Sequence, residues 1–306
     1  MSQLNYWACK NVKNEFSIER DDIVVMSHEI TIKFGGYLRK GESIYVNEKS
    51  LVALYDHIVI SGHLCVILDK LGQGAFGKVY KGFDYHSSKF IAIKSQPSVY
   101  AKLIARQSFA TKKNGIGLLD PKSNVGPTFL RDGNGYFVIP LADMNFNDWV
   151  INKSSSNENK LIIDGLINIC KDLIRLHTQG MVHMDLKMDN ILVVNDKSYI
   201  SDFGKVERIN KIIPSAQGNY LNYPQCDPNY FSEYSKSAYY TVNKKFDYYS
   251  LGKIIKNVSS KIKDPRLQIE LCNISKYLTC MEPKDRYPIT KIIEYLDSIS
   301  KNLHLL

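Results

Sequence analysis

The stretch that decides the fold of this chain runs from His183 to Gly204 and reads HMDLKMDNILVVNDKSYISDFG. Two short apolar runs flank the turn-forming residues 195–197, which predicts a tight β-hairpin. The hairpin would return Asp202 to the level of Asn190. An amide oxygen that faces a carboxylate across a strand pair suits an oxygen-ligand Mg²⁺ site. An ordinary polar hairpin with solvated acids would show the same pattern.

The order of residues in this stretch resembles the catalytic loop and metal-binding motif of eukaryotic-type protein kinases, H-R-D-L-x-x-x-N followed by D-F-G. The resemblance implies that Asp185 orients and deprotonates the acceptor hydroxyl and that Asn190 and Asp202 hold Mg²⁺. Lys187 resembles the lysine that serine/threonine kinases place on the γ-phosphate. Met184 stands where most regulated kinases carry arginine. The resemblance therefore implies a kinase of the non-RD type, and we expect no requirement for phosphorylation of its activation segment.

Composition fits a soluble globular protein of 306 residues, with 44% hydrophobic and 23% charged residues. The net charge of +9 suggests acidic partners, but the basic residues are spread along the chain, so nucleic-acid binding is not expected. No apolar run reaches the roughly 20 residues of a membrane span, and the first residues lack the apolar core of a signal peptide. The six cysteines form no C-x-x-C pair, so we expect thiols, a reducing compartment and a cytoplasmic protein.

A glycine-rich segment, LGQGAFGKVYKG, follows a predicted strand over residues 65–70. Gly72, Gly74 and Gly77 form G-x-G-x-x-G, in which backbone N–H groups can approach phosphate oxygens without a Cβ in the way. Dinucleotide-binding folds use the same glycines before a helix. Residues 78–81 instead predict a strand, and strand–loop–strand is the arrangement of protein kinases.

A second β-rich run, FIAIKS, contains Lys94 and resembles the kinase V-A-I-K strand, whose lysine binds the α- and β-phosphates. Kinases pair this lysine with a glutamate, yet residues 95–119 contain no acid. Gln107 lies near the expected place and offers a neutral amide. The residues that the resemblance places around ATP are Leu71, Gly72, Gly74, Gly77, Val79, Ala92, Lys94, Leu141, Ala142 and Leu192.

The remaining sequence continues the resemblance. A hairpin is expected from residues 128–131 and 136–139, and an amphipathic helix over residues 161–179 is expected to end at Gly180. Residues 205–233 resemble an activation segment. Asp247 resembles the aspartate that anchors the backbone of the catalytic loop. Arg286 resembles the arginine that pairs with a glutamate at the end of the activation segment, here Glu233.

These observations predict an α+β chain with the bilobal protein-kinase fold, a β-rich small lobe and a helical large lobe. We expect a β-rich N-terminal extension over residues 1–63 and a catalytic domain over 64–306, divided into lobes at 64–140 and 145–306. The function implied is Mg²⁺-dependent transfer of the ATP γ-phosphoryl group to serine or threonine hydroxyls of a protein. A pseudokinase that binds nucleotide or acts as a scaffold is the alternative. A small-molecule kinase of the same superfold fits less well, because such enzymes generally lack the long activation segment.

Overall fold

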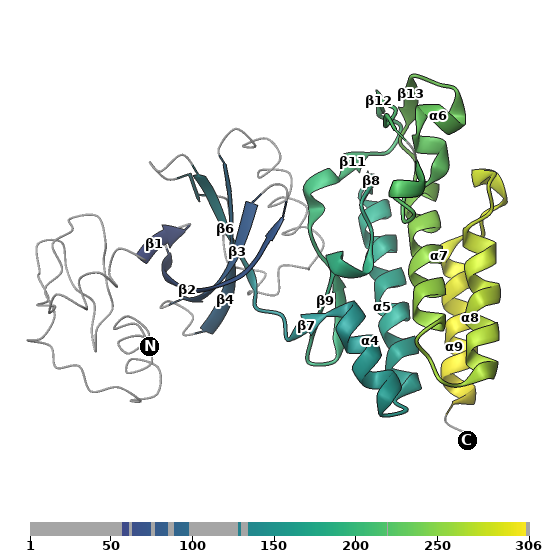
Figure 1. Cartoon of the computed structure of the whole chain (residues 1–306), viewed down its shortest axis with the longest axis horizontal. Helices are drawn as coiled ribbons and strands as arrows, with labels where there is room; N and C mark the ends of the chain where they lie inside the picture. Colours follow the sequence, from purple (N-terminus) through teal and green to yellow (C-terminus); the bar gives the residue numbers. More distant parts are fainter. Residues whose placement is uncertain are drawn as a thin grey trace, which may run out of the picture. The chain divides into compact units, whose positions relative to one another are not determined.

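The structure is a computed structural model that describes residues 57–60, 63–74, 77–84, 89–97, 128–129, 134–218 and 220–303. The chain divides into two compact units. The first comprises Met1–Lys112 and Gly117–Leu141, and the second comprises Lys113–Ile116 and Ala142–Leu306. The first unit is built on a sheet and the second mainly on helices, as the expected α+β class requires (Figure 1).

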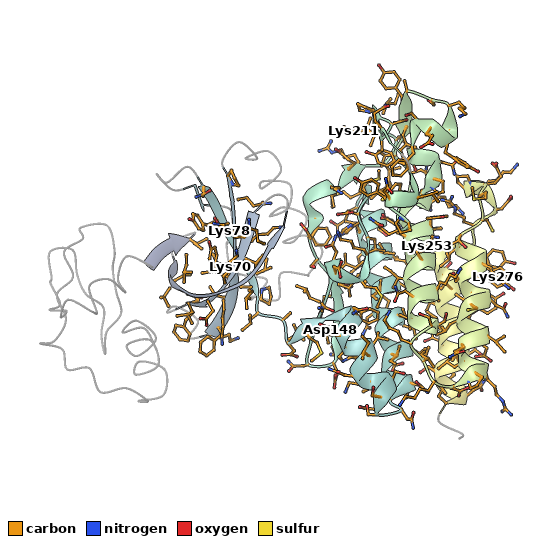
Figure 2. The ribbon with its side chains drawn as sticks, in the orientation of Figure 1. Lys70, Lys78, Asp148, Lys211, Lys253 and Lys276 are labelled. Atoms are coloured by element: carbon orange, nitrogen blue, oxygen red, sulfur yellow. The ribbon has the colours of Figure 1, made fainter. Side chains whose placement is uncertain are left out.

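The first unit contains a six-stranded sheet with the order β1-β2-β3-β4-β6-β5, in which every neighbouring pair is antiparallel. Figure 2 shows exposed Lys70 and Lys78 on adjacent strands of this sheet. The predicted strand after the glycine-rich segment and the predicted hairpin of β5 and β6 are both confirmed. The strands are β1 (His57–Ile60), β2 (His63–Gly74), β3 (Gly77–Asp84), β4 (Lys89–Pro97), β5 (Thr128–Phe129) and β6 (Asn134–Pro140).

One face of this sheet carries the core of the unit. Cross-strand partners share a face, and residues alternate between faces along each strand. Ile93 lies opposite both Tyr80 and Val138, and all three belong to one apolar cluster with Ile91 and Tyr136. The other face is therefore left for the residues between them in sequence, which include Ala92 and Lys94.

The second unit is dominated by helices that run alongside one another (Figure 1). Helix α5 contacts α4 and α9, and α7 contacts α8. Among the described residues, no helix is both long enough and apolar enough to cross a bilayer. The helices are α4 (Phe146–Ser155), α5 (Asn159–Thr178), α6 (Ser232–Ser235), α7 (Lys245–Ser259), α8 (Pro265–Leu278) and α9 (Ile289–Asn302).

Helix α5 confirms the amphipathic pattern seen in the sequence. Its predicted apolar face is buried, and the chain turns at Gly180, whose φ of 74° lies in the left-handed region that glycine tolerates. Helix α4 was not predicted, because its second half lies in the polar stretch NKSSS. Its first half carries Phe146, Trp149 and Val150 at helical spacing, all buried. Asn145 caps it by accepting a hydrogen bond from the Asp148 N–H (2.9 Å).

Short strands connect the helices of the second unit. The hairpin of β9 and β10 is confirmed, with Ile191 opposite Ile200 and a two-residue turn at Asn195–Asp196, both at positive φ. Strand β7 extends this hairpin into a three-stranded sheet, and two further pairs are β8 with β11 and β12 with β13. These strands are β7 (Met144–Asn145), β8 (Met181–Val182), β9 (Ile191–Val194), β10 (Lys197–Ile200), β11 (Glu207–Arg208), β12 (Ile212–Pro214) and β13 (Tyr239–Thr241).

Most of the expected N-terminal extension, together with Cys9 and Gln107, lies outside the described residues. Within that extension, residues 57–60 form β1, which pairs with β2 in the main sheet. The five cysteines among the described residues are free thiols.

Candidate active site

Asp247, in the first turn of α7, fixes the backbone of the loop from His183 to Asn190. The backbone N–H of His183 donates to Asp247 Oδ2 (2.8 Å), and that of Met184 donates to Oδ1 (3.1 Å). The same carboxylate contacts His177 Nε2 at 2.8 Å and is fully buried. The predicted anchoring role of Asp247 is confirmed. These contacts hold Met184 at a φ of 65°, a left-handed conformation that is uncommon for a residue with a side chain.

Asp185 lies at the centre of this loop with its side chain 12% exposed. Asn190 donates from Nδ2 to the Asp185 carbonyl oxygen (2.8 Å), which fixes the backbone that carries the carboxylate. Lys187 Nζ lies 3.9 Å from one carboxylate oxygen, and Lys205 Nζ lies 3.3 Å from the other. The Asp185 carboxylate therefore lies between two ammonium groups, and these can stabilise negative charge that develops beside it.

Lys205 is a member of this cluster that sequence reasoning did not assign. The sequence feature that could have pointed to Lys205 is its position directly after Asp202-Phe203-Gly204. In the structure it ends the short helix of residues 203–205. Cys226 also lies close enough for the charge of Asp185 to act on its thiol. Burial, followed by that negative charge, raises the pKa of Cys226 to about 12. The thiol stays protonated at neutral pH and is not a nucleophile candidate.

The two predicted metal ligands are joined by the β9–β10 hairpin. Ser201, which follows β10, donates from N (2.8 Å) and from Oγ (3.0 Å) to the carbonyl oxygen of Asn190. Asp202 comes next, at a φ of 56° and with an exposed side chain. The amide nitrogen of Asn190 is engaged by Asp185, so its side-chain oxygen is the atom left to bind a cation.

An amide oxygen and a carboxylate are the hard oxygen donors that Mg²⁺ prefers. Among the described residues there is no group of three or more His, Cys, Asp or Glu side chains that could hold a metal. The donor set of Asn190 and Asp202 therefore fits Mg²⁺ that takes its other ligands from phosphate oxygens or water, as such sites generally do.

The glycine-rich segment forms the end of the β2–β3 hairpin in the first unit. Gly72 pairs with Val79, and Gly74 pairs with Gly77. A Cβ added to Gly72 would meet nothing within 4 Å, which leaves open space beside the backbone. A Cβ on Gly77 would instead lie 2.2 Å from the carbonyl oxygen of Ser95. Gly77 is therefore required for strand packing, whereas Gly72 is free to admit a ligand.

Lys94 and two of the other residues predicted around ATP, Val79 and Ala92, share one face of the sheet. Val79 lies directly opposite Lys94, and Ala92 lies opposite Ile139. This face is opposite the one that carries the cluster of Ile91, Ile93 and Tyr136. On it Ala92 is buried, whereas Val79 and Lys94 are half-buried. The structure thus gathers Val79, Ala92 and Lys94 beside the glycine-rich hairpin.

The remaining predicted contacts are distributed over the two units. Leu71 is exposed at the end of β2, and Leu141 is half-buried just after β6. Ala142 and Leu192 belong to the second unit, where both are half-buried.

Gln96 is a residue that sequence reasoning missed. It is fully buried on β4, two residues beyond Lys94 and on the same face. Among the residues that the structure describes, neither its Nε2 nor its Oε1 has a hydrogen-bond partner. Its Cγ would lie 2.7 Å from a Cβ at Gly77, so it packs against the glycine-rich hairpin.

The predicted partner of Arg286 is corrected by the structure. Arg286 forms a fork of hydrogen bonds to Asp227, from Nη1 to Oδ2 and from Nη2 to Oδ1 (3.0 Å), and both side chains are fully buried. Glu233 is exposed on α6. Asp227 is positioned because it caps the short helix of residues 228–230, where its side chain accepts from the Asn229 N–H (3.0 Å). The carboxylate that pairs with Arg286 therefore comes from a residue six positions before Glu233 in the sequence.

Met184 lies in an apolar cluster that includes residues of the activation segment. Its side chain is 4% exposed, and the cluster also contains Cys226, Phe231, Tyr240 and Phe246. The position that carries arginine in many kinases therefore holds a buried thioether here. Packing, and not ion pairing, ties this part of the segment to the catalytic loop.

Comparisons with known proteins agree with this geometry. A family model described as the protein kinase domain matches residues 65–303. A protein of Acanthamoeba polyphaga mimivirus, named as a candidate serine/threonine-protein kinase, is 30% identical over 236 residues. That alignment covers 66% of this chain and 35% of the relative.

Two further relatives match smaller parts of the chain. The cyclin-dependent kinase B1-1 of Arabidopsis thaliana is 26% identical over 157 residues, which cover 45% of this chain and 51% of the relative. The mitogen-activated protein kinase p38b of Drosophila melanogaster is 32% identical over 149 residues, which cover 45% of this chain and 40% of the relative. The chain therefore spans between about a third and a half of the length of these relatives.

Proposed function

Because the chain belongs to the protein kinase family, we propose that it transfers the γ-phosphoryl group of ATP to serine or threonine hydroxyls of a protein substrate. One observation carries the proposal. Asp185, Lys187 and Asn190 are held in one loop whose backbone is fixed by the buried Asp247. A scaffold without chemistry has no need of a proton-accepting carboxylate between two ammonium groups.

The reaction assigns a separate task to each of these groups. Asp185 accepts the proton of the acceptor hydroxyl as the acceptor oxygen bonds to the γ-phosphorus and the bond from that phosphorus to the β–γ bridging oxygen breaks. ADP leaves with the electron pair of the broken bond. Lys187 and Lys205, at 3.9 Å and 3.3 Å from Asp185, are placed to offset negative charge around the transferred group.

The phosphates of ATP are assigned to the glycine-rich hairpin and to Lys94. Gly72 leaves open space for an approaching ligand, and Lys94 projects from the same sheet face as Val79 and Ala92. Asn190 and Asp202 would hold Mg²⁺, which, when bound, neutralises phosphate charge. The adenine contacts are assigned to Leu71, Val79, Ala92, Leu141, Ala142 and Leu192.

The acceptor class and the location rest on separate observations. Lys187 stands where serine/threonine kinases carry lysine, and the mimivirus relative bears a serine/threonine-protein kinase name. With Met184 before Asp185, the protein is of the non-RD type. The free thiols of the described cysteines favour a reducing compartment such as the cytoplasm.

A pseudokinase is the second candidate, and one observation favours it. Residues 95–119 contain no acidic residue that could pair with Lys94 in the usual way. A pseudokinase would bind nucleotide without turnover. The two functions therefore differ in phosphoryl transfer and agree in ATP binding.

The test uses [γ-³²P]ATP, Mg²⁺ and a mixture of protein acceptors, followed by phosphoamino-acid analysis. We expect label on serine or threonine and its loss when EDTA removes Mg²⁺. Lys94→Met and Asp202→Ala should each abolish transfer with little change in the unfolding midpoint without ATP, because both residues act on the nucleotide and its metal.

Lys89→Met on the same strand and Asp189→Ala in the catalytic loop are the matched controls, since both side chains are exposed. ATP binding by the wild type without any transfer would favour the pseudokinase. Full activity in Lys94→Met or Asp202→Ala would refute the assignment of that residue.

A further inference from the structure

A cavity of about 670 Å³ lies in the second unit, and none of its lining residues is assigned to catalysis, to Mg²⁺ or to the nucleotide. Its walls come from the end of α5, the start of α7 and the stretch of residues 283–290 that leads into α9. The volume lies within the range of about 300–1,000 Å³ that is typical of ligand pockets.

Positive charge is concentrated around this cavity. Lys244, Lys245 and Lys284 line it, and none of its lining residues is acidic. Lys244 and Lys284 are exposed, and within the described ranges neither forms an ion pair. Glu282 and Asp285 flank Lys284 in sequence but do not line the cavity, and both are exposed. A ligand in the cavity would therefore meet cations and no fixed anion.

Two of these lysines occupy positions that helix electrostatics disfavours. Lys244 is the N-cap of α7 and Lys245 is its first residue, where the partial positive charge of the helix terminus repels cations. Lys245 donates from Nζ to the carbonyl oxygen of Arg286. Burial lowers the pKa of Lys245, and the charges of Lys244 and Arg286 lower it further. An anion bound here would relieve this repulsion.

The rest of the lining is largely apolar. Ile174, Ile209 and Ile289 line the cavity together with Tyr248 and Pro288. An aliphatic group could therefore be buried next to the anion. A free phosphate would leave this apolar surface uncovered, so the ligand should combine negative charge with aliphatic side chains.

We propose that this cavity is a docking site for a protein partner, through a peptide segment in which acidic residues alternate with aliphatic ones. Charge complementarity selects the acidic residues, and the apolar wall selects the aliphatic ones. A peptide fits better than a membrane surface, because the apolar residues line a concavity that a side chain can enter.

The cavity is also connected to the catalytic loop. His177 in its wall contacts Asp247 Oδ2 (2.8 Å), the same oxygen that accepts from the His183 N–H. A peptide docked in the cavity would thus be separated only by His177 from Asp247, the residue that fixes the backbone of the catalytic loop. The docking proposal itself is independent of catalysis.

The experiment measures fluorescence anisotropy of a fluorescein-labelled peptide of alternating glutamate and leucine residues, titrated with the full chain without ATP. We expect saturable binding that weakens with salt. The double substitution Lys244→Glu/Lys284→Glu should weaken binding about tenfold or more. A peptide with glycine in place of leucine should also bind more weakly.

The matched control is Lys263→Glu/Lys276→Glu, which makes the same change in net charge at two exposed lysines outside the cavity; Lys276 is labelled in Figure 2. A second variant, Thr290→Trp, fills the cavity from its exposed rim and should also weaken binding, whereas Ser298→Trp on the same helix should not. Unfolding midpoints verify that each variant is folded.

Three results would overturn the proposal. The wild type could fail to bind the peptide, or both double variants could lose affinity equally, which would indicate unspecific charge attraction. The third is preferential binding to anionic phospholipid vesicles that is lost in Lys244→Glu/Lys284→Glu, which would assign the cavity to a membrane surface.

Discussion

At the scale of single residues, Gln96 carries two buried polar atoms that have no hydrogen-bond partner among the described residues. An amide that is fully buried with neither its nitrogen nor its oxygen paired loses its hydration without replacement. Such groups are rare in folded proteins, and each one calls for a physical reason. Gln96 lies beside Lys94 and Gly77, which are assigned to the phosphates of ATP. The free-energy cost of its buried, unpaired amide therefore arises next to the proposed nucleotide site.

Replacing Gln96 with methionine should stabilise the protein in the absence of ATP. The methionine side chain has a similar shape and no strongly polar group, so the substitution removes an unpaired donor and an unpaired acceptor. We expect the free energy of unfolding to rise by about 1–3 kcal/mol. Urea unfolding followed by circular dichroism measures it.

The control for this substitution is Gln179→Met at an exposed position, which should change the free energy of unfolding by about 0.5 kcal/mol or less. A clear loss of stability in Gln96→Met would contradict the account, since it would mean that the buried amide is satisfied in solution.

At the scale of elements, the buried pair of Arg286 and Asp227 joins the end of the activation segment to the stretch that precedes α9. Removing one partner of a buried ion pair leaves an uncompensated charge. Asp227→Ala should therefore lower the free energy of unfolding by about 3–5 kcal/mol. Glu233→Ala should lower it by about 0.5 kcal/mol or less, because that carboxylate is exposed. Urea midpoints of the two variants measure both effects, and a larger loss in Glu233→Ala would restore the pairing expected from sequence.

The activation segment should act without phosphorylation. In kinases switched by phosphate, an arginine before the catalytic aspartate grips the phosphate group. Met184 occupies that position in a cluster with Phe231 and Tyr240, and Ser215 in the segment is buried. Apolar packing holds this part of the segment against the catalytic loop. Because Met184 replaces the arginine, a phosphate on the segment would find no guanidinium group next to Asp185.

The comparison that tests this is the rate on a protein acceptor before and after phosphatase treatment. We expect a change of less than about twofold, with phosphatase inhibited before the assay. A large loss of rate that maps to one phosphorylated residue between 205 and 233 would contradict the account.

At the scale of the whole molecule, local sequence patterns predicted most of the elements. β-rich apolar runs between turn residues predicted strands β2 to β6, and helical spacing together with Gly180 predicted α5. The hairpin of β9 and β10 followed from its turn residues, and it brings Ser201, the residue before Asp202, into hydrogen bonds with the carbonyl oxygen of Asn190. Helix α4 was not predicted, because its polar second half continues no apolar pattern from Phe146, Trp149 and Val150.

The site was less predictable where it depends on contacts between distant segments. Asp227 replaces Glu233 because folding, and not spacing in the sequence, decides which carboxylate reaches Arg286. Lys205 joins Asp185 through the path of the chain after β10, which no periodicity encodes. The lack of partners for Gln96 likewise depends on what surrounds it in three dimensions.

Asp185 is proposed as the proton acceptor in phosphoryl transfer, and the substitution Asp185→Asn removes that capacity alone. The amide keeps the size of the side chain and cannot act as the proton acceptor, so we expect kcat to fall by about 10²-fold or more. The stabilisation by MgATP in a thermal-shift assay should be retained. Asp189→Asn, an exposed neighbour in the same loop, should keep both the rate and the shift. A kcat for Asp185→Asn that equals the wild-type value, with label still on serine or threonine, would refute the role of Asp185 as proton acceptor.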